Sequence, residues 1–390
     1  MHKPTAADVE RARAAVGDLA RHTPVLPSAT LTERCGGEVV LKAESLQRTG
    51  SFKIRGALNK LGALGEEGCA NGVVAASAGN HAQALAFAAR ARGVPCEVFM
   101  PRAAPIAKAE GAEALGATVI AGGETVDECL QAATARAAES GMAFVHPFDD
   151  PDIVAGQGTL GLELLADVPD LAKVVVPVGG GGLAAGIAIA VKAVRPGVEV
   201  VGVQVDAPRS IADGIAIKHL GELTGALLDE WVDGLVFVAE DDIAEAIVLL
   251  LEKAKLVVEG AGAVGAAALL GGLTNPAEEG TTVVVLSGGN VDAGLLAEVA
   301  RRHETLAGRR LVVFTRVSDR PGSLAQLLAC VGETGASLVD VQHMREGVDL
   351  HVRETAVQLV LETRGREHAQ SVLATVAAAG YEATTPSSRN

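Results

Sequence analysis

Short apolar runs alternate with helical patterns along the first three quarters of the chain. Val73–Ala76 and Cys96–Pro101 are almost entirely apolar, whereas the segments after them repeat apolar residues every three or four positions. Apolar strands separated by helices are typical of parallel sheets covered on both faces. Further strands are predicted at 38–42, 117–122, 174–178, 198–205 and 282–287, and helices at 8–20 and from 183 to 194. The sequence therefore predicts an α/β protein with two doubly wound open sheets, the smaller one (about 72–148) inserted in the larger.

The pattern changes after about residue 305. A strand pattern at Leu311–Val317 is followed by a DRPG turn, a helical pattern, two more strands, a second helix and a short last strand that starts at Tyr381. This order, βαββαβ, predicts a ferredoxin-like domain at 309–386, after a first domain at 1–305. The polar stretch Arg301–Arg310 is the predicted linker between them.

Composition and charge exclude several classes of protein. The net charge of −15 argues against nucleic acid as a partner, because phosphates need a basic surface. The five cysteines are scattered and form no CxxC pair, which favours free thiols in a reducing compartment over disulfides or a zinc site. The polar N-terminus is not a signal peptide, and no apolar run reaches the length of a membrane span. We expect a cytoplasmic protein that does not bind membranes.

The stretch TGSFKIRGA places Lys53 between aromatic, apolar and basic neighbours. A lysine that forms a Schiff base needs a lowered pKa, which burial or a nearby positive charge provides. Phe52 and Ile54 are predicted to supply the burial, and Arg55 the charge. Taken alone, the pattern is also that of a surface lysine on a turn, so the glycine-rich turns elsewhere decide between the two interpretations.

Three glycine-rich turns directly follow predicted strands, at the strand ends where open α/β sheets bind ligands. In VPVGGGGL, the four glycines 179–182 precede a helix, which predicts a cup of backbone N–H groups for a phosphate. A merely tight turn needs only one or two glycines. A dinucleotide fingerprint is the alternative, because Gly179, Gly181 and Ala184 are followed by Glu199 twenty residues after the first glycine.

The other two turns carry polar side chains. SAGNHAQ (Ser77–Gln83) brings Ser77, Asn80 and His81 onto one loop, which suits a small carboxylate and a ring hydroxyl, with a helix cap by Ser77 as the alternative. SGGN (Ser287–Asn290) offers a hydroxyl at a strand end, although alone it is more often a plain turn. With Lys53 and the phosphate cup, these turns predict a pyridoxal phosphate pocket.

TGSFKIRGA, SAGNHAQ, VPVGGGGL and LSGGN stand in the order found in fold type II pyridoxal phosphate enzymes, which share the fold of the tryptophan synthase β-subunit. Over nearly its whole length the chain resembles threonine dehydratase (threonine ammonia-lyase). The tail, with VSDRPGSLAQLL and ASLVDVQHMREGVDLHV, looks like the ACT regulatory domain of such enzymes. The resemblance implies pyridoxal 5'-phosphate as cofactor and the conversion of L-threonine, and of L-serine, to a 2-oxo acid and ammonia.

The resemblance also implies roles for individual residues. Lys53 carries the cofactor and takes the α-proton, Asn80 bonds the ring hydroxyl, Ser287 the ring nitrogen, and Glu259 is an acid near the pocket or, alternatively, a helix-end charge. The residues implied to hold the cofactor are Phe52, Lys53, Asn80, Gly179, Gly180, Gly181, Gly182, Leu183 and Ser287. Those implied to face the substrate are Ser77, Asn80 and His81. Those implied to meet an amino-acid effector are Asp319, Gly322, Ser323 and Leu324.

The chain departs from the family pattern at two places. The connection at Asp206–Arg209 is shorter than usual, and Gln204 stands where some relatives carry an acidic metal ligand, so no metal site is predicted. A third position, Ala78, differs from racemising relatives, which carry a serine there, so dehydration is expected to dominate over racemisation.

Several alternatives stay open from the sequence. A serine racemase and a non-catalytic amino-acid sensor are the competing functions. The tail is expected to bind isoleucine or valine, with a dimerisation module that binds no ligand as the alternative. A homo-oligomer, either a dimer or a tetramer, is expected, and the sequence does not decide between threonine and serine as substrate.

Overall fold

The computed structural model describes residues 2–205, 210–212, 214–215, 220–345 and 353–386. Its contacts divide the chain into two compact units, 1–292 and 293–390. The division lies before the expected boundary at 305, because helix α12 (Ala293–Leu306) packs on strand β11 (Arg310–Ser318) of the second unit. The predicted linker Arg301–Arg310 is therefore the end of one helix and the start of a strand.

The larger sheet of the first unit has, within the described residues, six strands in the order β1-β2-β10-β7-β8-β9. All neighbours are parallel except β1 and β2. Every residue of β10 is buried, as expected for a central strand covered on both faces. The strands are β1 (Val25–Pro27), β2 (Val39–Ala43), β7 (Leu171–Pro177), β8 (Glu199–Val205), β9 (Gly234–Val238) and β10 (Thr281–Leu286).

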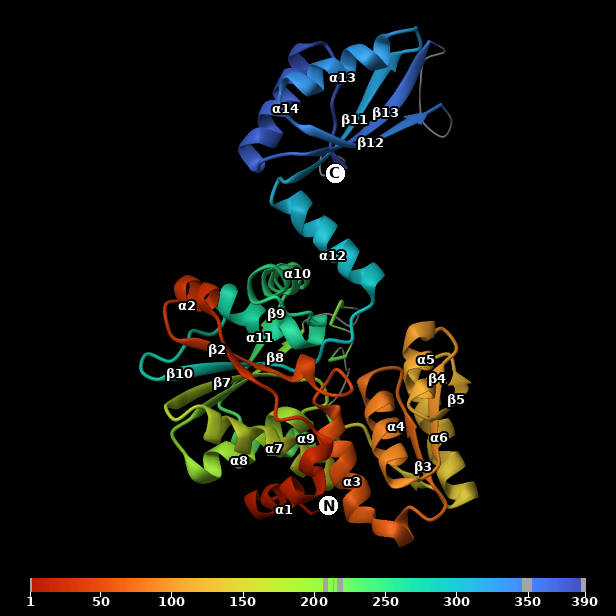
Figure 1. The fold of residues 1–390 in the computed structure, drawn as a ribbon, viewed down its shortest axis with the longest axis vertical. Helices are drawn as coiled ribbons and strands as arrows, with labels where there is room; N and C mark the ends of the chain where they lie inside the picture. Colours follow the sequence, from red (N-terminus) through yellow and green to blue (C-terminus); the bar gives the residue numbers. More distant parts are fainter. Residues whose placement is uncertain (1, 206–209, 213, 216–219, 346–352, 387–390) are drawn as a thin grey trace. The chain divides into compact units, whose positions relative to one another are not determined.

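Helices cover both faces of this sheet. In Figure 1, α7 and α8 lie on one face and α10 and α11 on the other. The helical elements around this sheet are α1 (Ala6–Val16), η1 (Gly17–Leu19), α2 (Ala29–Cys35), η2 (Glu44–Leu46), α3 (Lys53–Gly68), α7 (Pro151–Asp167), α8 (Gly182–Val194), α9 (Glu222–Trp231), α10 (Glu240–Leu249), η3 (Leu250–Ala254) and α11 (Gly260–Leu270).

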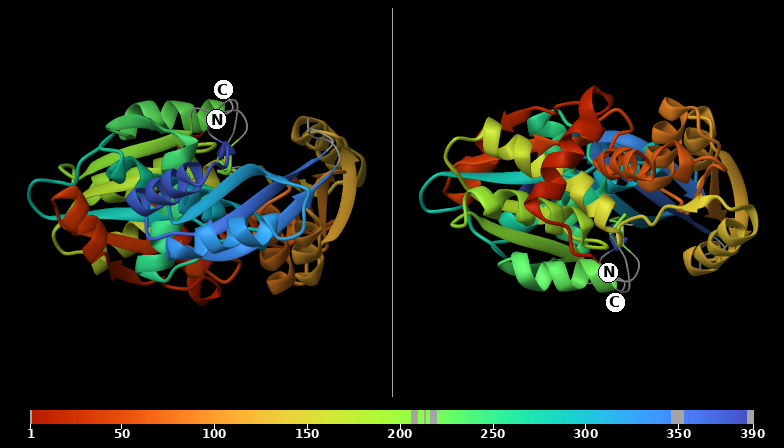
Figure 2. Two further views of the ribbon diagram at one scale, coloured as in Figure 1. Left: turned by 90° about the horizontal axis from the view of Figure 1, so that it is seen from above. Right: turned by 90° about the horizontal axis from the view of Figure 1, so that it is seen from below.

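The smaller sheet has four described strands, all parallel, in the order β5-β4-β3-β6. Figure 2 shows this part, coloured orange to yellow, as a layered block beside the larger sheet. The prediction of two doubly wound sheets is confirmed, and the strands of the smaller sheet lie between β2 and β7 in the sequence. Its elements are β3 (Val73–Ala76), α4 (Asn80–Arg92), β4 (Cys96–Pro101), α5 (Ile106–Ala114), β5 (Thr118–Gly123), α6 (Val126–Ser140) and β6 (Ala143–Phe144).

The second unit contains an antiparallel sheet with the strand order β11-β13-β12 among its described residues. Helices α13 and α14 share one apolar core with this sheet. The strand predicted from Tyr381 is reduced to a single bridge between Thr384 and Phe314, because Pro386 lacks the N–H that would extend the pairing. Besides α12 and β11, the elements are α13 (Ser323–Glu333), β12 (Ser337–Met344), β13 (Glu354–Glu362) and α14 (Arg366–Ala378).

No helix in the described part of the chain combines the length and the apolar composition that a membrane crossing requires.

Candidate active site

Lys53 is the first residue of α3, and the loop before it is bonded to the loop after β10. The Phe52 N–H donates to the Ser287 carbonyl over 3.1 Å, and the Gly289 N–H donates to the Gly50 carbonyl over 2.9 Å. The lysine motif and the SGGN turn are far apart in the sequence, but these backbone bonds bring them together at the carboxyl end of β10.

The side chain of Lys53 is half-buried, and its amine end is surrounded by protein. Its Nζ donates to the Pro147 carbonyl over 2.8 Å and lies 5.4 Å from the centre of the Phe52 ring. Burial lowers the pKa of Lys53 to about 8, while the nearby Glu259 carboxylate opposes this effect. Ile54 is fully buried. Burial is thus the cause of the lowered pKa, as predicted, whereas Ile54 itself packs in an apolar core with Ala57 and Leu58.

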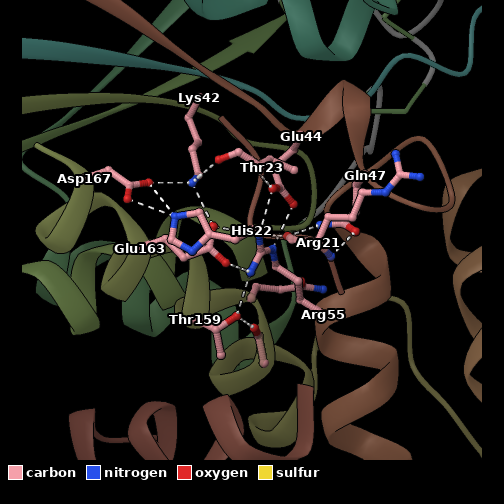
Figure 3. Close-up of polar contacts among 12 residues, drawn as sticks. Arg21, His22, Thr23, Lys42, Glu44, Gln47, Arg55, Thr159, Glu163 and Asp167 are labelled. Atoms are coloured by element: carbon pink, nitrogen blue, oxygen red, sulfur yellow. Dashed lines mark hydrogen bonds and ion pairs between the residues drawn. The ribbon is translucent and has the colours of Figure 1, made fainter. Parts of the chain in front are cut away.

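The predicted role of Arg55 is wrong. Instead of lowering the pKa of Lys53, the Arg55 guanidinium is neutralised by Glu44 and Glu163 (Figure 3). It donates to both carboxylate oxygens of Glu44 over 2.8 Å and to Glu163 over 2.6 Å. Successive residues on a helix point in different directions, so Arg55 leaves α3 on another side than Lys53.

Arg55 belongs to a cluster of acidic and basic side chains, called here the buried charge cluster after its fully buried members Lys42, Glu44 and Arg55, with Glu163 and Asp167 at its outer edge. Lys42 bridges Glu163 (2.7 Å) and Asp167 (3.1 Å). Burial opposes the charge of Glu44, but the charge and hydrogen bonds of Arg55 outweigh it and hold the pKa of Glu44 below its ordinary value. The cluster joins β2, η2, α3 and α7, and so holds the start of α3 in place.

The glycine turn 179–182 lies between β7 and α8, as predicted. The Phe148 ring packs against Gly180 so closely that a Cβ atom there would overlap it, so this glycine is required by packing alone. The first N–H groups of α8 have no acceptor within the helix and lie at its positive end, which suits a phosphate. Pro147, which accepts from Lys53, directly precedes Phe148. The lysine and the glycine turn thus belong to one site.

The dinucleotide alternative is wrong. Glu199 is the first residue of β8 and pairs in register with Lys173, which lies near the start of the neighbouring strand. The two side chains form an ion pair of 3.1 Å. Glu199 therefore lies at the opposite end of the sheet from the glycine turn, where it has no access to a ligand bound there.

Asn80, Glu259 and Ser287 come together beside Lys53. The Asn80 Nδ2 donates to Glu259 Oε1 over 2.6 Å, and the Glu259 N–H donates to the Gly288 carbonyl over 3.1 Å. Glu259 is the N-cap residue of α11, without a capping hydrogen bond from its side chain, so it lies both at the positive end of a helix and beside Lys53. The Ser287 hydroxyl is buried, 3.4 Å from the Ala261 carbonyl.

Ser77 and His81 lie on the predicted loop with different partners. Ser77 Oγ accepts from the Gly79 N–H over 3.2 Å, and Gly79 is the N-cap residue of α4, so Ser77 is not the helix cap. Burial, then the charge of Lys53, lower the pKa of His81 to about 3. The neutral ring lies with Nε2 3.1 Å from the Val145 carbonyl. A ligand at this loop would therefore meet the backbone of His81 rather than its side chain.

Sequence reasoning missed three residues of this site. Pro147 and Phe148 contact Lys53 and Gly180, respectively, and Asn290 contacts Asn80. A backbone carbonyl acceptor such as that of Pro147 has no sequence signal of its own. Asn290 lies within the SGGN motif, where its polar side chain beside a strand-end serine is the signal that could have found it.

In the second unit, Gly322 directly precedes α13 with φ +91°. Ser323 and Leu324 are half-buried at the helix start, and Asp319 forms an ion pair of 2.9 Å with Arg345. The predicted effector residues therefore gather around the first turn of this helix.

The shortened connection Asp206–Arg209 lies outside the described residues. Gln204 is half-buried near the end of β8. In the part of the chain that the structure describes, no three His, Cys, Asp or Glu side chains are grouped as a metal site would need.

Comparison with known proteins defines the class. Residues 16–288 match the model of the pyridoxal-phosphate dependent enzyme family. The chain belongs to this family, and its cofactor is pyridoxal phosphate, as the lysine and the glycine turns predicted.

Individual relatives show which members of the family this chain resembles. The chain is 43% identical to an L-threonine ammonia-lyase of Thermotoga maritima, covering 97% of this chain and 98% of that one. It is 44% identical to an L-threonine ammonia-lyase of Geobacter sulfurreducens, covering 93% and 94%. Among solved structures it is similar to maize serine racemase (TM-score 0.73, 32% identity, 78% of this chain and 99% of that chain). It is also similar to the processed form of threonine deaminase isoform 2 from Solanum lycopersicum (TM-score 0.70, 33% identity, 76% and 90%).

Proposed function

We propose that this protein is a threonine ammonia-lyase that converts L-threonine, and L-serine, to the corresponding 2-oxo acid and ammonia. The observation that carries the proposal is Lys53, whose amine has a pKa of about 8 and lies beside a glycine turn and an asparagine loop. The similarity to two threonine ammonia-lyases extends over both units of the chain, which supports threonine as the substrate.

The residues around Lys53 fit the cofactor. The start of α8 with Gly179–Leu183 offers backbone N–H groups for its phosphate. Asn80 offers an amide NH₂ for the ring oxygen, and Ser287 a buried hydroxyl for the ring nitrogen. Two hydroxyls close to Lys53 in sequence, Thr49 Oγ1 and Ser51 Oγ, are buried with no hydrogen-bond partner among the described residues, as expected where a polar group is to be received.

The chemistry follows from the state of the lysine. The bound cofactor supplies an electron sink for negative charge at the substrate Cα. Lys53, neutral at Nζ in part of the molecules near neutral pH, takes the Cα proton as general base. The Cβ–O bond then breaks, the hydroxyl leaves with a proton as water, and hydrolysis of the resulting enamine releases ammonia and the 2-oxo acid. Backbone N–H groups at the start of α4 hold the substrate carboxylate.

The first test measures the 2-oxo acid formed from L-threonine and from L-serine, and the D-serine formed from L-serine. We expect 2-oxo acid from both and little D-serine, because Ala78 offers no proton donor on the loop. Ala78→Ser is expected to raise the D-serine share, while the exposed Ala70→Ser serves as a matched control. D-serine formed faster than pyruvate would favour the racemase alternative, to which the structural similarity to maize serine racemase points.

We further propose that the second unit is an ACT regulatory domain that binds isoleucine or valine. The backbone N–H groups of residues 319–324, at the start of α13, would receive the amino-acid carboxylate. The βαββα order with a bridge at Thr384 supports this assignment. Coupling of about 1–3 kcal/mol would shift substrate affinity roughly 5- to 150-fold.

Glycine variants on α13 test the effector site. Gly322 has φ +91° and open space around it, so Gly322→Ala strains the turn without a clash and is expected to abolish effector binding in calorimetry on the full chain. Gly332, on the same helix and also in open space, has no such constraint, and Gly332→Ala is expected to keep the response. If none of the twenty amino acids binds outside the active site, the regulatory proposal is wrong.

We place the protein in the cytoplasm and expect a dimer or tetramer. The five cysteines are all free thiols, which suits a reducing compartment. Sedimentation of the full chain would give the oligomer size.

A further inference from the structure

We propose that Asn290 is a positioning residue that fixes the amide of Asn80 with its NH₂ group towards Glu259 and the ligand pocket. The pocket and its cofactor follow from the family to which the chain belongs. The inference rests on the proposed function only where it concerns the substrate that this pocket binds. It concerns a residue in the SGGN turn to which neither the sequence motifs nor the proposed chemistry gives a role.

The hydrogen bonds determine both amide orientations. Asn290 Nδ2 donates to the Thr49 carbonyl over 2.8 Å and to Asn80 Oδ1 over 2.8 Å. A carbonyl only accepts, so the group of Asn290 that faces Thr49 is the NH₂. The atom of Asn80 that faces this NH₂ must then be its oxygen. The Asn80 NH₂ consequently points to the Glu259 carboxylate, which accepts over 2.6 Å. Acceptors at both ends, Thr49 and Glu259, leave one consistent arrangement.

The backbone makes room for this chain of hydrogen bonds. A Cβ atom on Gly50 would overlap the Asn290 side chain, and a Cβ atom on Gly288 would overlap the Glu259 carboxylate. Both glycines belong to motifs that the sequence singled out for other reasons. Glycine is required at both positions, because a side chain at Gly50 would clash with the Asn290 amide and one at Gly288 with the Glu259 carboxylate.

The chain of hydrogen bonds also links the two sheets of the first unit. Asn290 follows β10 of the larger sheet, whereas Asn80 begins α4 of the smaller sheet. Gln83, one turn further along α4, has its Oε1 3.5 Å from Asn290 Nδ2. Asn290, in the part with the larger sheet, therefore helps to determine whether Asn80, in the part with the smaller sheet, directs its NH₂ group or its oxygen towards the pocket.

Loss of the Asn290 NH₂ removes the donor to the Asn80 oxygen, so the Glu259 carboxylate alone remains to orient the amide and the Asn80 side chain is held less firmly towards the pocket. An amide NH₂ has two hydrogens, so in the native orientation one bonds Glu259 and the second remains for a negatively charged or polar atom of the ligand. Asn290 therefore acts on ligand binding mainly through Asn80, while its bond to the Thr49 carbonyl also ties it to the lysine motif.

A double-mutant cycle on the full-length protein tests this inference. The variants are Asn80→Ala, Asn290→Ala and the double variant, each freed of cofactor, and the measurement is the Kd of pyridoxal phosphate by fluorescence titration. Each single change is expected to weaken binding by about threefold to tenfold, the size of one hydrogen bond. In the double variant, loss of Asn290 is expected to add little to the loss of Asn80. Asn71→Ala, an exposed asparagine in the same unit, is the matched control and is expected to bind as the wild type does.

A second variant probes the direction of the amide. Asn290→Asp keeps the shape but replaces the donor by an acceptor, so it draws the Asn80 NH₂ away from the pocket. We expect Asn290→Asp to weaken cofactor binding more than Asn290→Ala and to shift the absorption maximum of the bound cofactor. Additive losses in the cycle, or wild-type binding by Asn290→Asp, would overturn the inference. A wild-type enzyme that binds the cofactor but leaves threonine and serine unchanged would contradict the proposed function instead, and the cycle could still be read.

Discussion

Replacing Lys53 by alanine is expected to reduce 2-oxo acid formation from L-threonine by at least about 10²- to 10⁴-fold, the usual contribution of a general base. The variant loses both the amine that carries the cofactor and the group that takes the Cα proton. Lys3→Ala is the matched control, because Lys3 is an exposed lysine that forms an ion pair with Glu230, and this variant is expected to keep the wild-type rate.

Chemical trapping separates the two roles of Lys53. Borohydride reduction of the cofactor-loaded wild type, followed by peptide mapping, is expected to place the pyridoxyl mass on Lys53. Only the neutral amine attacks a carbonyl, and with a pKa of about 8 roughly a tenth of it is neutral at pH 7. The initial rate at which the cofactor-free protein is trapped should therefore rise with pH through about 8 and level off above it, once most of the amine is neutral. The mass on another lysine, or full activity of Lys53→Ala, would refute the assignment.

The sequence was sufficient to predict the position of those parts of the site that directly follow strands. The turns after β3, β7 and β10 could be placed because parallel strands bring their carboxyl ends to one edge of a sheet. Their contacts could not be placed, because the acceptors of Lys53 and His81 are the carbonyls of Pro147 and Val145, and any residue type supplies a carbonyl.

The error over Arg55 has a definable cause. Lys53 and Arg55 are two positions apart in the sequence, and the prediction assumes that both point into one pocket. The helix begins at Lys53, and residues two apart on a helix do not face each other. A predicted helix start at Lys53 would have placed Arg55 away from the pocket. Its partners, Glu44 and Glu163, come from separate elements and have no local sequence signal.

Replacing Arg55 by methionine is expected to destabilise the first unit by about 3–5 kcal/mol, because it removes the guanidinium that binds both oxygens of the buried Glu44 and leaves only the weaker influence of the Lys42 charge. Glu44 is 0% exposed, and the Thr23 hydroxyl, which also donates to it, cannot neutralise its charge. Arg34→Met is the matched control, since the ion pair of Arg34 with Glu245 is exposed and is worth about 0–1 kcal/mol. The measurement is the urea midpoint of unfolding followed by circular dichroism.

The loss caused by Arg55→Met should depend on pH in a direction set by Glu44. In the wild type the pKa of Glu44 is lowered by Arg55, so its ionised form stabilises the fold above the ordinary pKa of glutamate and this contribution is lost as the pH falls through the lowered value. In the variant the lowering by Arg55 is gone, so burial raises the pKa of Glu44 against the weaker opposing effects of Thr23 and Lys42, and ionised Glu44 destabilises the fold at neutral pH. The difference in stability between the two proteins should therefore be largest near pH 7 and shrink as the pH falls towards about 4.

A double variant checks the cause of this loss. Glu44→Leu combined with Arg55→Met removes the carboxylate left without its guanidinium and is expected to recover part of the stability at pH 7. If Arg55→Met is no less stable than Arg34→Met at pH 7, or if the double variant is less stable than the single one, the buried charge cluster does not hold the start of α3 in the way described.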